Sequence, residues 1–207
     1  IVTRSNKRAN LFNQAVRTRI RYMDDDLCGG DLMMVVKNNY FWLDEKTEAG
    51  FIANGDSLEI KKIVRRKELY GFNFAECIVK LSDYENTPEL TVNLLLDSIY
   101  TEVPSLTKDQ QQELFANVME DVADEPIKGL RMAYLRKNPY FNALQVKFNY
   151  AVTCHKAQGG QWPCVFIDQG YLTKEMLNVE YIRWLYTAFT RASEKVYLMN
   201  FSDEFFE

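Results

Sequence analysis

Histidine and cysteine are scarce in this chain. Its 207 residues include one histidine and four cysteines, and no two cysteines form a C-x-x-C pair. Zinc sites need several such ligands at short spacings, so neither a zinc site nor a disulfide framework is expected. Cys154 and Cys164 lie in apolar runs. We therefore expect free, buried thiols in a reducing, cytoplasmic setting.

Long apolar stretches are also missing. No run approaches the roughly 20 residues that a membrane-crossing helix needs, so no membrane partner is expected. The first ten residues, IVTRSNKRAN, include neither an initiator methionine nor the apolar stretch of a signal peptide. Because Ile1 and Val2 look like the middle of a strand, we expect a fragment of a longer protein.

Two motifs of ATP-hydrolysing proteins are absent as well. The sequence has no G-x-x-x-x-G-K-[ST] phosphate loop and no acidic pair placed after a buried strand to hold magnesium. The acidic run from Asp24 to Asp26 instead precedes Gly29 and Gly30. These residues alone cannot form a complete ATPase site.

The net charge of −4 hides an uneven distribution. Residues 1–22 and 126–167 are rich in lysine and arginine and contain no acid, whereas residues 83–125 hold eleven acids and only one base, Lys108. A polyanion responds to the local field, so the basic flanks keep phosphate-bearing partners in consideration. Solvated helix faces are the alternative for any single basic run, and the acidic stretch has no assigned role.

The apolar pattern predicts an α/β fold interrupted by a small barrel. A strand ends near Thr3, and Ser5 is a candidate N-cap for a helix that reaches about Arg21. Short strands are expected at 32–37, 57–64, 74–81 and 90–96, and such close spacing suggests a small barrel. Later elements are helices after Thr107 and at 127–137 and 179–192, and strands at 146–153, 165–168 and 196–199. The first and last elements together form one α/β layer.

Thr153 to Gln161 (TCHKAQGGQ) concentrates polar side chains where a strand meets a loop. In α/β folds this edge of the sheet binds ligands. Gly159 and Gly160 permit close approach or a positive φ. The hydroxyl of Thr153 and the imidazole of His155 are suited to donate to a phosphodiester oxygen. Taken singly, a structural histidine and an ordinary turn are the alternatives.

Tyr186 to Ala192 (YTAFTRA) places one arginine in an otherwise apolar helix. Leu185, Ala188 and Phe189 are expected to face the core, with Arg191 at its edge. A guanidinium presents a planar fork of donors that matches phosphate oxygens, and it keeps its charge. Arg191 is therefore a candidate for stabilising charge during phosphoryl transfer, and a plain salt bridge is the alternative.

Together, in this order and spacing, the two segments resemble motifs V and VI of superfamily 1 DNA helicases of the UvrD and RecD kind. The RecD-like branch is the closer match, because Gly30 to Met33, Lys37 to Asn39 and Asn54 to Asp56 look like its barrel insertion. Val2 to Arg8 (VTRSNKR) looks like motif IV. The resemblance implies the C-terminal motor half of an ATP-dependent helicase, of the kind that works in DNA repair and recombination.

The resemblance also implies a domain plan. A RecA-like parallel-sheet domain, the second motor domain, would be formed by residues 1–25 and 144–207. An inserted small SH3-like β-barrel would cover residues 26–103, and a helical segment would cover residues 104–143. The implied partners are single-stranded DNA, its junction with duplex, and the N-terminal RecA-like domain of the same protein.

Individual roles follow from the resemblance. Arg191 would be the arginine finger, the catalytic residue that reaches the γ-phosphate of ATP. ATP would also be bound by Arg4, Gln158, Gly159 and Gln161, the last standing where many relatives have a glutamate. Single-stranded DNA would be held by Thr153, His155 and Lys156, and the two sites would be coupled by Tyr186, Thr187 and Thr190. No metal ligand is expected among them, since the Mg²⁺ that accompanies ATP would bind the missing N-terminal half; without that half the chain would be inactive.

Two alternatives stay open. One is a non-catalytic nucleic-acid-binding or interaction module in which the barrel is the working part. The aromatic run Tyr40 to Trp42, after basic Lys37, would then be a candidate stacking surface for bases, although half-buried aromatics of a small barrel are the favoured explanation. The other is an RNA helicase, because motifs V and VI contact the backbone and only the 2′-hydroxyl separates the two nucleic acids.

Overall fold

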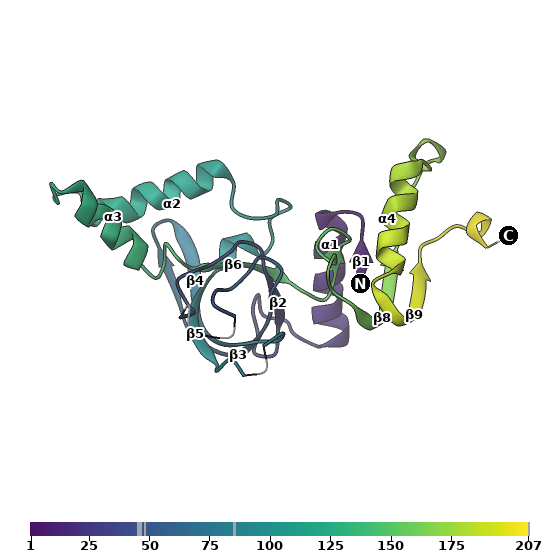
Figure 1. The fold of residues 1–207 in the computed structure, drawn as a ribbon, viewed down its shortest axis with the longest axis horizontal. Coiled ribbons are helices and arrows are strands. Elements are labelled where there is room, and N and C mark those ends of the chain that lie inside the picture. The colour runs from purple at the N-terminus through teal and green to yellow at the C-terminus, as the bar shows by residue number, and fades with distance from the viewer. Residues whose placement is uncertain (45–46, 48, 85, 207) are drawn as a thin grey trace. The chain divides into compact units, whose positions relative to one another are not determined.

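The chain divides into two compact units (Figure 1). The computed structural model describes residues 1–44, 47, 49–84 and 86–206, so Glu85 of the acidic stretch lies outside the described residues. Unit 1 consists of residues 1–24 and 150–207, and unit 2 consists of residues 25–149. Among the described residues no helix is both long enough and apolar enough to span a bilayer.

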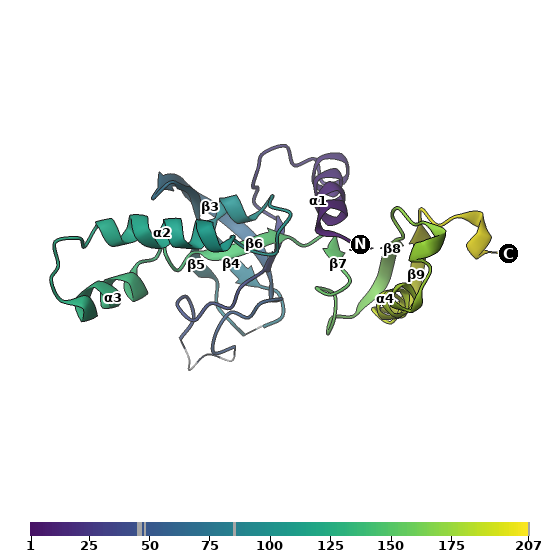
Figure 2. The ribbon, with the colours of Figure 1, turned by 90° about the horizontal axis from the view of Figure 1, so that it is seen from above.

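Unit 1 is built on a parallel sheet. Its strands are β1 (Val2–Thr3), β7 (Val152–Thr153), β8 (Trp162–Asp168) and β9 (Ala192–Met199), in the order β7-β1-β8-β9. Each neighbouring pair is parallel. Helix α4 (Val179–Phe189) connects β8 to β9 and lies beside them in both views (Figures 1 and 2). The α/β parallel sheet expected from the sequence is therefore present.

Helix α1 (Asn6–Ala15) follows β1 and continues as a π-helix over Val16–Ile20. The predicted cap is confirmed, since Ser5 Oγ accepts from the Arg8 N–H at 3.3 Å. The wider π-turn rotates the side chains that follow Ala15, so Arg17 is buried and Ile20 is exposed. Asn13, in the preceding α-helix, is also buried. Asn13 exchanges two hydrogen bonds with the backbone of Ala151, at 2.9 and 2.7 Å, and so ties α1 to the residue before β7.

The two faces of β8 differ. Val165 and Ile167 are buried in one apolar cluster with Ala188 of α4. Side chains alternate along a strand, so Cys164 and Phe166 point to the opposite face, where both are exposed. The prediction that Cys164 is buried is therefore wrong. Cys154 is buried as predicted, and all four cysteines are free.

Unit 2 contains a closed five-stranded barrel in the order β2-β3-β4-β5-β6. Its strands are β2 (Leu32–Val35), β3 (Ser57–Leu69), β4 (Phe72–Leu81), β5 (Leu90–Leu95) and β6 (Leu144–Phe148). β6 closes the barrel by pairing antiparallel with β2 and parallel with β5. The small barrel expected from the strand spacing is present, with a fifth strand that comes from beyond residue 103.

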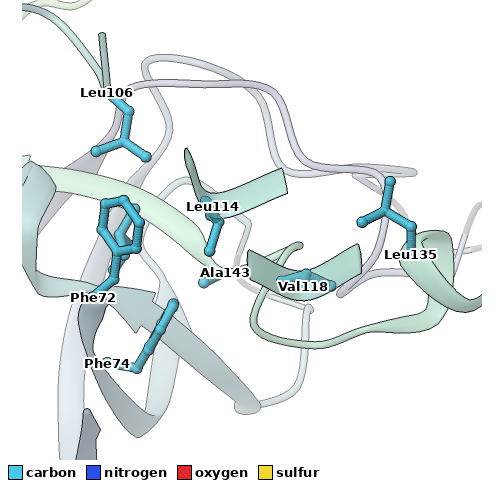
Figure 3. Packing of buried hydrophobic residues seen from close by; sticks show 8 residues of the cluster. Phe72, Phe74, Leu106, Leu114, Val118, Leu135 and Ala143 are labelled. Atoms are coloured by element: carbon cyan, nitrogen blue, oxygen red, sulfur yellow. The ribbon is translucent and has the colours of Figure 1, made fainter. Parts of the chain in front are cut away.

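Two helices, α2 (Lys108–Glu120) and α3 (Lys128–Lys137), lie between β5 and β6 in the sequence. Thr107 caps α2 in a full capping box with Gln110. Leu114 and Val118 of α2 and Leu135 of α3 pack with Phe72 and Phe74 of β4 in one buried cluster (Figure 3). The helical segment therefore shares its core with the barrel. Three short 3₁₀ turns complete the described elements, at Leu96–Ser98, Lys174–Met176 and Asp203–Phe205.

One predicted strand is in fact two. The alternation over 146–153 was read as a single strand of the parallel-sheet domain, with a boundary at 144. In the structure Leu144–Phe148 belongs to the barrel, and the chain returns to unit 1 at Tyr150 before β7 begins. The side chain of Asn149, the residue after β6, donates to Ser57 Oγ at 2.8 Å and so still contacts the barrel. Alternation alone cannot reveal the break, because both strands share the same period.

Candidate functional site

The loop after β7 is anchored by two buried residues and exposes its polar ones. β7 pairs with β1, which sets Thr153 beside Thr3 at the carboxyl ends of two parallel strands. Turns follow from Cys154 to Gly159; Cys154 and Ala157 are buried, and His155 is exposed. Gln158 and Gly159, and Gln161 after the loop, are exposed as well, and Thr153 and Lys156 are half-buried. The loop therefore offers its polar groups at the edge where α/β folds bind ligands.

Both predicted glycine roles occur. Gly159 has φ +89°, a region that residues with a Cβ rarely adopt. At Gly160 a Cβ would lie 2.5 Å from the ring of Trp162. The first glycine thus provides the turn, and the second allows a close approach.

Replacing Gly159 by alanine is expected to lower the free energy of unfolding by about 1–2 kcal/mol, because the native φ is strained for alanine. Gly129→Ala is the matched control. It lies in helix α3 with open space around its Cα and no positive φ, so this change is expected to stabilise by up to about 1 kcal/mol. Urea denaturation followed by circular dichroism measures the free energy of unfolding of both variants. Changes of the same sign would contradict the conclusion that the backbone at Gly159 requires a glycine.

Arg4 lies directly after β1 and is held by aromatic rings of α4. Its guanidinium carbon is 5.5 Å from the ring centroid of Tyr181 and 5.6 Å from that of Trp184. One nitrogen donates to the Tyr171 carbonyl at 3.5 Å. Cation–π contacts of this kind orient the charge without neutralising it. Sequence reasoning missed the two aromatics, although their spacing of three residues on a helix is a usable signal.

A pocket of about 420 Å³ in unit 1 gathers four of the predicted site residues, Arg4, His155, Gln158 and Thr187. Trp184 also lines it, and its buried Nε1 has no hydrogen-bond partner within the described residues. A buried donor left unpaired is costly and would be satisfied by an acceptor on a ligand. Glu180 and Arg183, which also line the pocket, pair with each other, so Arg4 is the cation that remains for an anionic, oxygen-rich ligand.

Arg191 lies outside that pocket, between the end of α4 and the loop. Its Nε donates to the Thr187 carbonyl at 3.1 Å, and its two terminal nitrogens donate to the Gly160 carbonyl at 3.1 Å and to Thr190 Oγ1 at 3.0 Å. The predicted coupling residues Thr187 and Thr190 therefore contact Arg191 directly. The third, Tyr186, projects into solvent with 71% of its surface exposed. The predicted burial of Phe189 is wrong, because this side chain is exposed.

Burial changes the acid–base properties of the loop. It raises the pKa of the Cys154 thiol, against the opposing charge of Arg191, so this cysteine stays protonated and is no nucleophile. Burial also lowers the pKa of Lys156, because the ammonium loses part of its hydration. An anion bound beside Lys156 would restore that stabilisation.

A partly buried ion pair joins α1 to the sheet, with Asp168 fully buried and the Arg8 side chain 37% exposed. Asp168, at the end of β8, is fully buried, and Arg8 grips its two oxygens at 2.8 and 2.6 Å. Asn200 donates a further hydrogen bond to the same carboxylate. Arg8, the last residue of the predicted motif IV segment, thus has a structural contact, and sequence reasoning missed its partner. The available signal was an acid at the end of an otherwise apolar strand.

Comparisons with known proteins found one family model, one viral protein and one solved structure that are similar to this chain. Residues 148–199 match the model of the UvrD-like helicase C-terminal domain, a segment that contains both the loop and Arg191. An uncharacterized protein of Acanthamoeba polyphaga mimivirus is 24% identical over 240 residues, covering 96% of this chain and 47% of that protein. The crystal structure of Pif1 helicase from Candida albicans has a TM-score of 0.42 and 13% identity, covering 86% of this chain and 33% of that one. The chain thus spans about half the length of the curated relative it matches.

Proposed function

We propose that this chain is the C-terminal motor half of an ATP-dependent helicase or translocase of superfamily 1. The match of residues 148–199 to the UvrD-like helicase C-terminal domain carries the proposal, because it supports a helicase-family role for the segment that holds the loop and Arg191. The cationic pocket at the carboxyl ends of parallel strands supports it independently. We further assign the chain to the RecD-like branch, with an SH3-like barrel inserted in a RecA-like domain.

On the nucleotide side, Arg4 and Arg191 neutralise charge at the γ-phosphate of ATP, and Gln158, Gly159 and Gln161 line its approach. The guanidinium of Arg191 exchanges its hydrogen bonds to neutral carbonyls for bidentate hydrogen bonds to phosphate oxygens, in which donor and acceptor are both charged. The unpaired Nε1 of Trp184 fits the same ligand class.

The Mg²⁺ that accompanies ATP is assigned to another part of the protein. We place its ligands and the phosphate loop in an N-terminal RecA-like domain of the same protein, as the helicase resemblance implies. Across the residues that the structure describes, no three His, Cys, Asp or Glu side chains lie close enough together to hold a metal ion. When bound, the metal would neutralise the β- and γ-phosphates.

On the strand side, Thr153, His155 and Lys156 contact the backbone of single-stranded DNA. Backbone contacts carry no sequence information, which suits a motor that moves over any sequence. Thr187 and Thr190 transmit the state of the nucleotide, since both bond Arg191, and Thr187 lies on α4, the helix whose rings also position Arg4. Tyr186 is the third coupling residue and lies at the solvent-exposed side of α4.

The strand-binding role is tested on the 207-residue chain by fluorescence anisotropy with a labelled single-stranded DNA. Lys156→Met is expected to weaken binding by about tenfold, the loss of one charge-assisted hydrogen bond. It should also reduce the salt dependence by about 0.7 in slope, one phosphate contact. Lys195→Met is the control, because Lys195 is also a lysine of unit 1 but lies on β9, away from the loop.

Equal affinities for the two lysine variants would refute the assignment of the loop. Competition with an RNA of the same sequence decides the nucleic acid. If the chain binds the RNA more tightly, RNA rather than DNA is the substrate, and the assignment of the chain to a motor is unchanged.

A further inference from the structure

Unit 2 contains a second pocket that the motor function does not use. Its volume is about 700 Å³, within the usual range for ligand sites. It is formed by the segment after β2, by α2, by the end of α3 and by the residues that lead into β6. Leu106, Leu114 and Ala143, labelled in Figure 3, are the part of its lining that belongs to the buried cluster.

The lining is cationic in a chain that is acidic overall. Lys37, Lys108 and Arg136 line the pocket, and among the residues that the structure describes no Asp or Glu does. Within the described residues, none of these three side chains makes an ion pair or a hydrogen bond. Lys108 is also the first residue of α2, a 13-residue helix whose amino end carries partial positive charge. The pocket therefore attracts an anion.

Two flat aromatic surfaces stand beside these charges. Tyr40 is 69% exposed and stacks on Phe51, with centroids 4.8 Å apart. Phe115 is 40% exposed and is supported edge-on by Phe141 at 6.3 Å. Each ring is held by a neighbour and keeps a large accessible area. Rings held in this way are suited to stack on planar bases. An inorganic anion or a carboxylate has no planar ring and would not use them.

Hydrogen bonds within unit 2 hold the polar side of the pocket in place without a ligand. Asn39 and the indole N–H of Trp42 both donate to the Asn142 carbonyl at 2.8 Å, which ties the segment after β2 to the residues before β6. Gln145 is only 7% exposed, and its Oε1 accepts from the Leu106 N–H at 3.0 Å. Its Nε2 makes no hydrogen bond within the part of the chain that the structure describes. The amide NH₂ of Gln145, with its two N–H donors, is therefore available in a pocket that this residue lines.

We propose that this pocket binds one nucleotide of a single-stranded nucleic acid. The phosphate lies among Lys37, Lys108 and Arg136, the base stacks on Tyr40 or Phe115, and Gln145 Nε2 donates to an oxygen of the base or sugar. An acidic peptide would satisfy the cations but leave the aromatic faces unused. The proposal rests on the proposed function only for the choice of a strand as ligand, and its residues belong to the other unit.

The test uses the 207-residue chain and a twelve-nucleotide oligothymidine with one photoreactive 4-thiothymine. Cross-linked peptides are expected from residues 37–41, 111–115 or 136–145, in addition to the loop 153–161. Lys108→Ala should weaken binding by about tenfold and lower the salt slope by about 0.7. Tyr40→Leu should weaken it by about five- to a hundredfold. Lys128→Ala is the matched control, since Lys128 is likewise the first residue of a helix but lies outside the pocket.

Three outcomes overturn the proposal: equal effects of Lys108→Ala and Lys128→Ala, no cross-link to the pocket, or displacement by polyglutamate at the concentration at which unlabelled oligothymidine competes. Displacement by free thymidine 5′-monophosphate at a lower concentration than by the oligonucleotide would assign a free-nucleotide site and also overturn it. Pocket cross-links that persist while the loop 153–161 gives none would contradict the motor assignment alone, so the two failures are distinguishable.

Discussion

Replacing Arg191 by alanine in the full-length protein is expected to reduce strand-stimulated ATP hydrolysis by about 10³-fold or more. In the proposed mechanism its guanidinium stabilises the charge that develops on the transferred phosphoryl group. Such a loss corresponds to at least about 4 kcal/mol of transition-state stabilisation. Nucleotide binding should stay nearly intact, because the contact is strongest in the transition state. Steady-state turnover and binding of a fluorescent ATP analogue measure the two quantities separately.

Arg191 also bonds the end of α4, so stability has to be measured beside activity. Arg191→Lys keeps the charge but lacks the fork of donors, and it should fold well while recovering only a small part of the rate. Arg19→Ala, an exposed arginine of the π-turn after α1, is the control and should leave turnover unchanged. Normal turnover in Arg191→Ala with a normal melting temperature would remove the arginine-finger role.

Replacing Arg8 by methionine is expected to lower the free energy of unfolding by about 3–5 kcal/mol. Asp168 has no solvent exposure, so removing its bidentate partner leaves a buried carboxylate whose remaining side-chain donor, among the described residues, is Asn200. For a chain of this size, that loss corresponds to a fall of roughly 10 °C in melting temperature. Chemical denaturation monitored by circular dichroism gives the free energy directly.

Two further variants separate burial from the mere loss of a charge pair. Arg183→Met breaks the pair with Glu180, in which both side chains are more than two-thirds exposed, and it should cost under about 1 kcal/mol. The double change Arg8→Met with Asp168→Asn removes the buried charge as well and should recover part of the loss. If Arg8→Met lowers the free energy of unfolding no more than Arg183→Met does, the pair of Arg8 with the buried Asp168 contributes no more than an exposed pair.

Much of the secondary structure follows from short-range signals. The caps at Ser5 and Thr107 and most strand and helix positions were predictable, because hydroxyl caps and apolar periodicity act over a few residues. The π-turn after Ala15 was not, since the buried Asn13 and Arg17 follow from contacts outside the helix. The role of β6 in closing the barrel was not predictable either. Its partners β2 and β5 are distant in the sequence, and alternating polarity does not indicate which strands pair.

The candidate site was predictable to a similar extent. Arg4, His155 and Gln158 line one pocket because β1 and β7 are parallel neighbours that end at one edge, which the strand-and-loop pattern indicates. The aromatic rings that hold Arg4 and the carbonyls that hold Arg191 depend on how α4 is rotated against the sheet. No local pattern encodes that rotation. The pocket of unit 2 was not predictable either, because its lining comes from segments that are far apart in the sequence, between residue 37 and residue 145.

The position of the barrel within the sequence has a consequence for how the chain folds. Pairing β1 with β7 closes a loop that contains all of unit 2, and for a disordered loop of that length the entropy cost is on the order of 4 kcal/mol. A barrel that folds first removes most of that cost, because β6 already ends beside β2 and the chain needs only a few residues to reach β7. The insertion would then serve as a folding template, and the parallel sheet would be the last part of the chain to form.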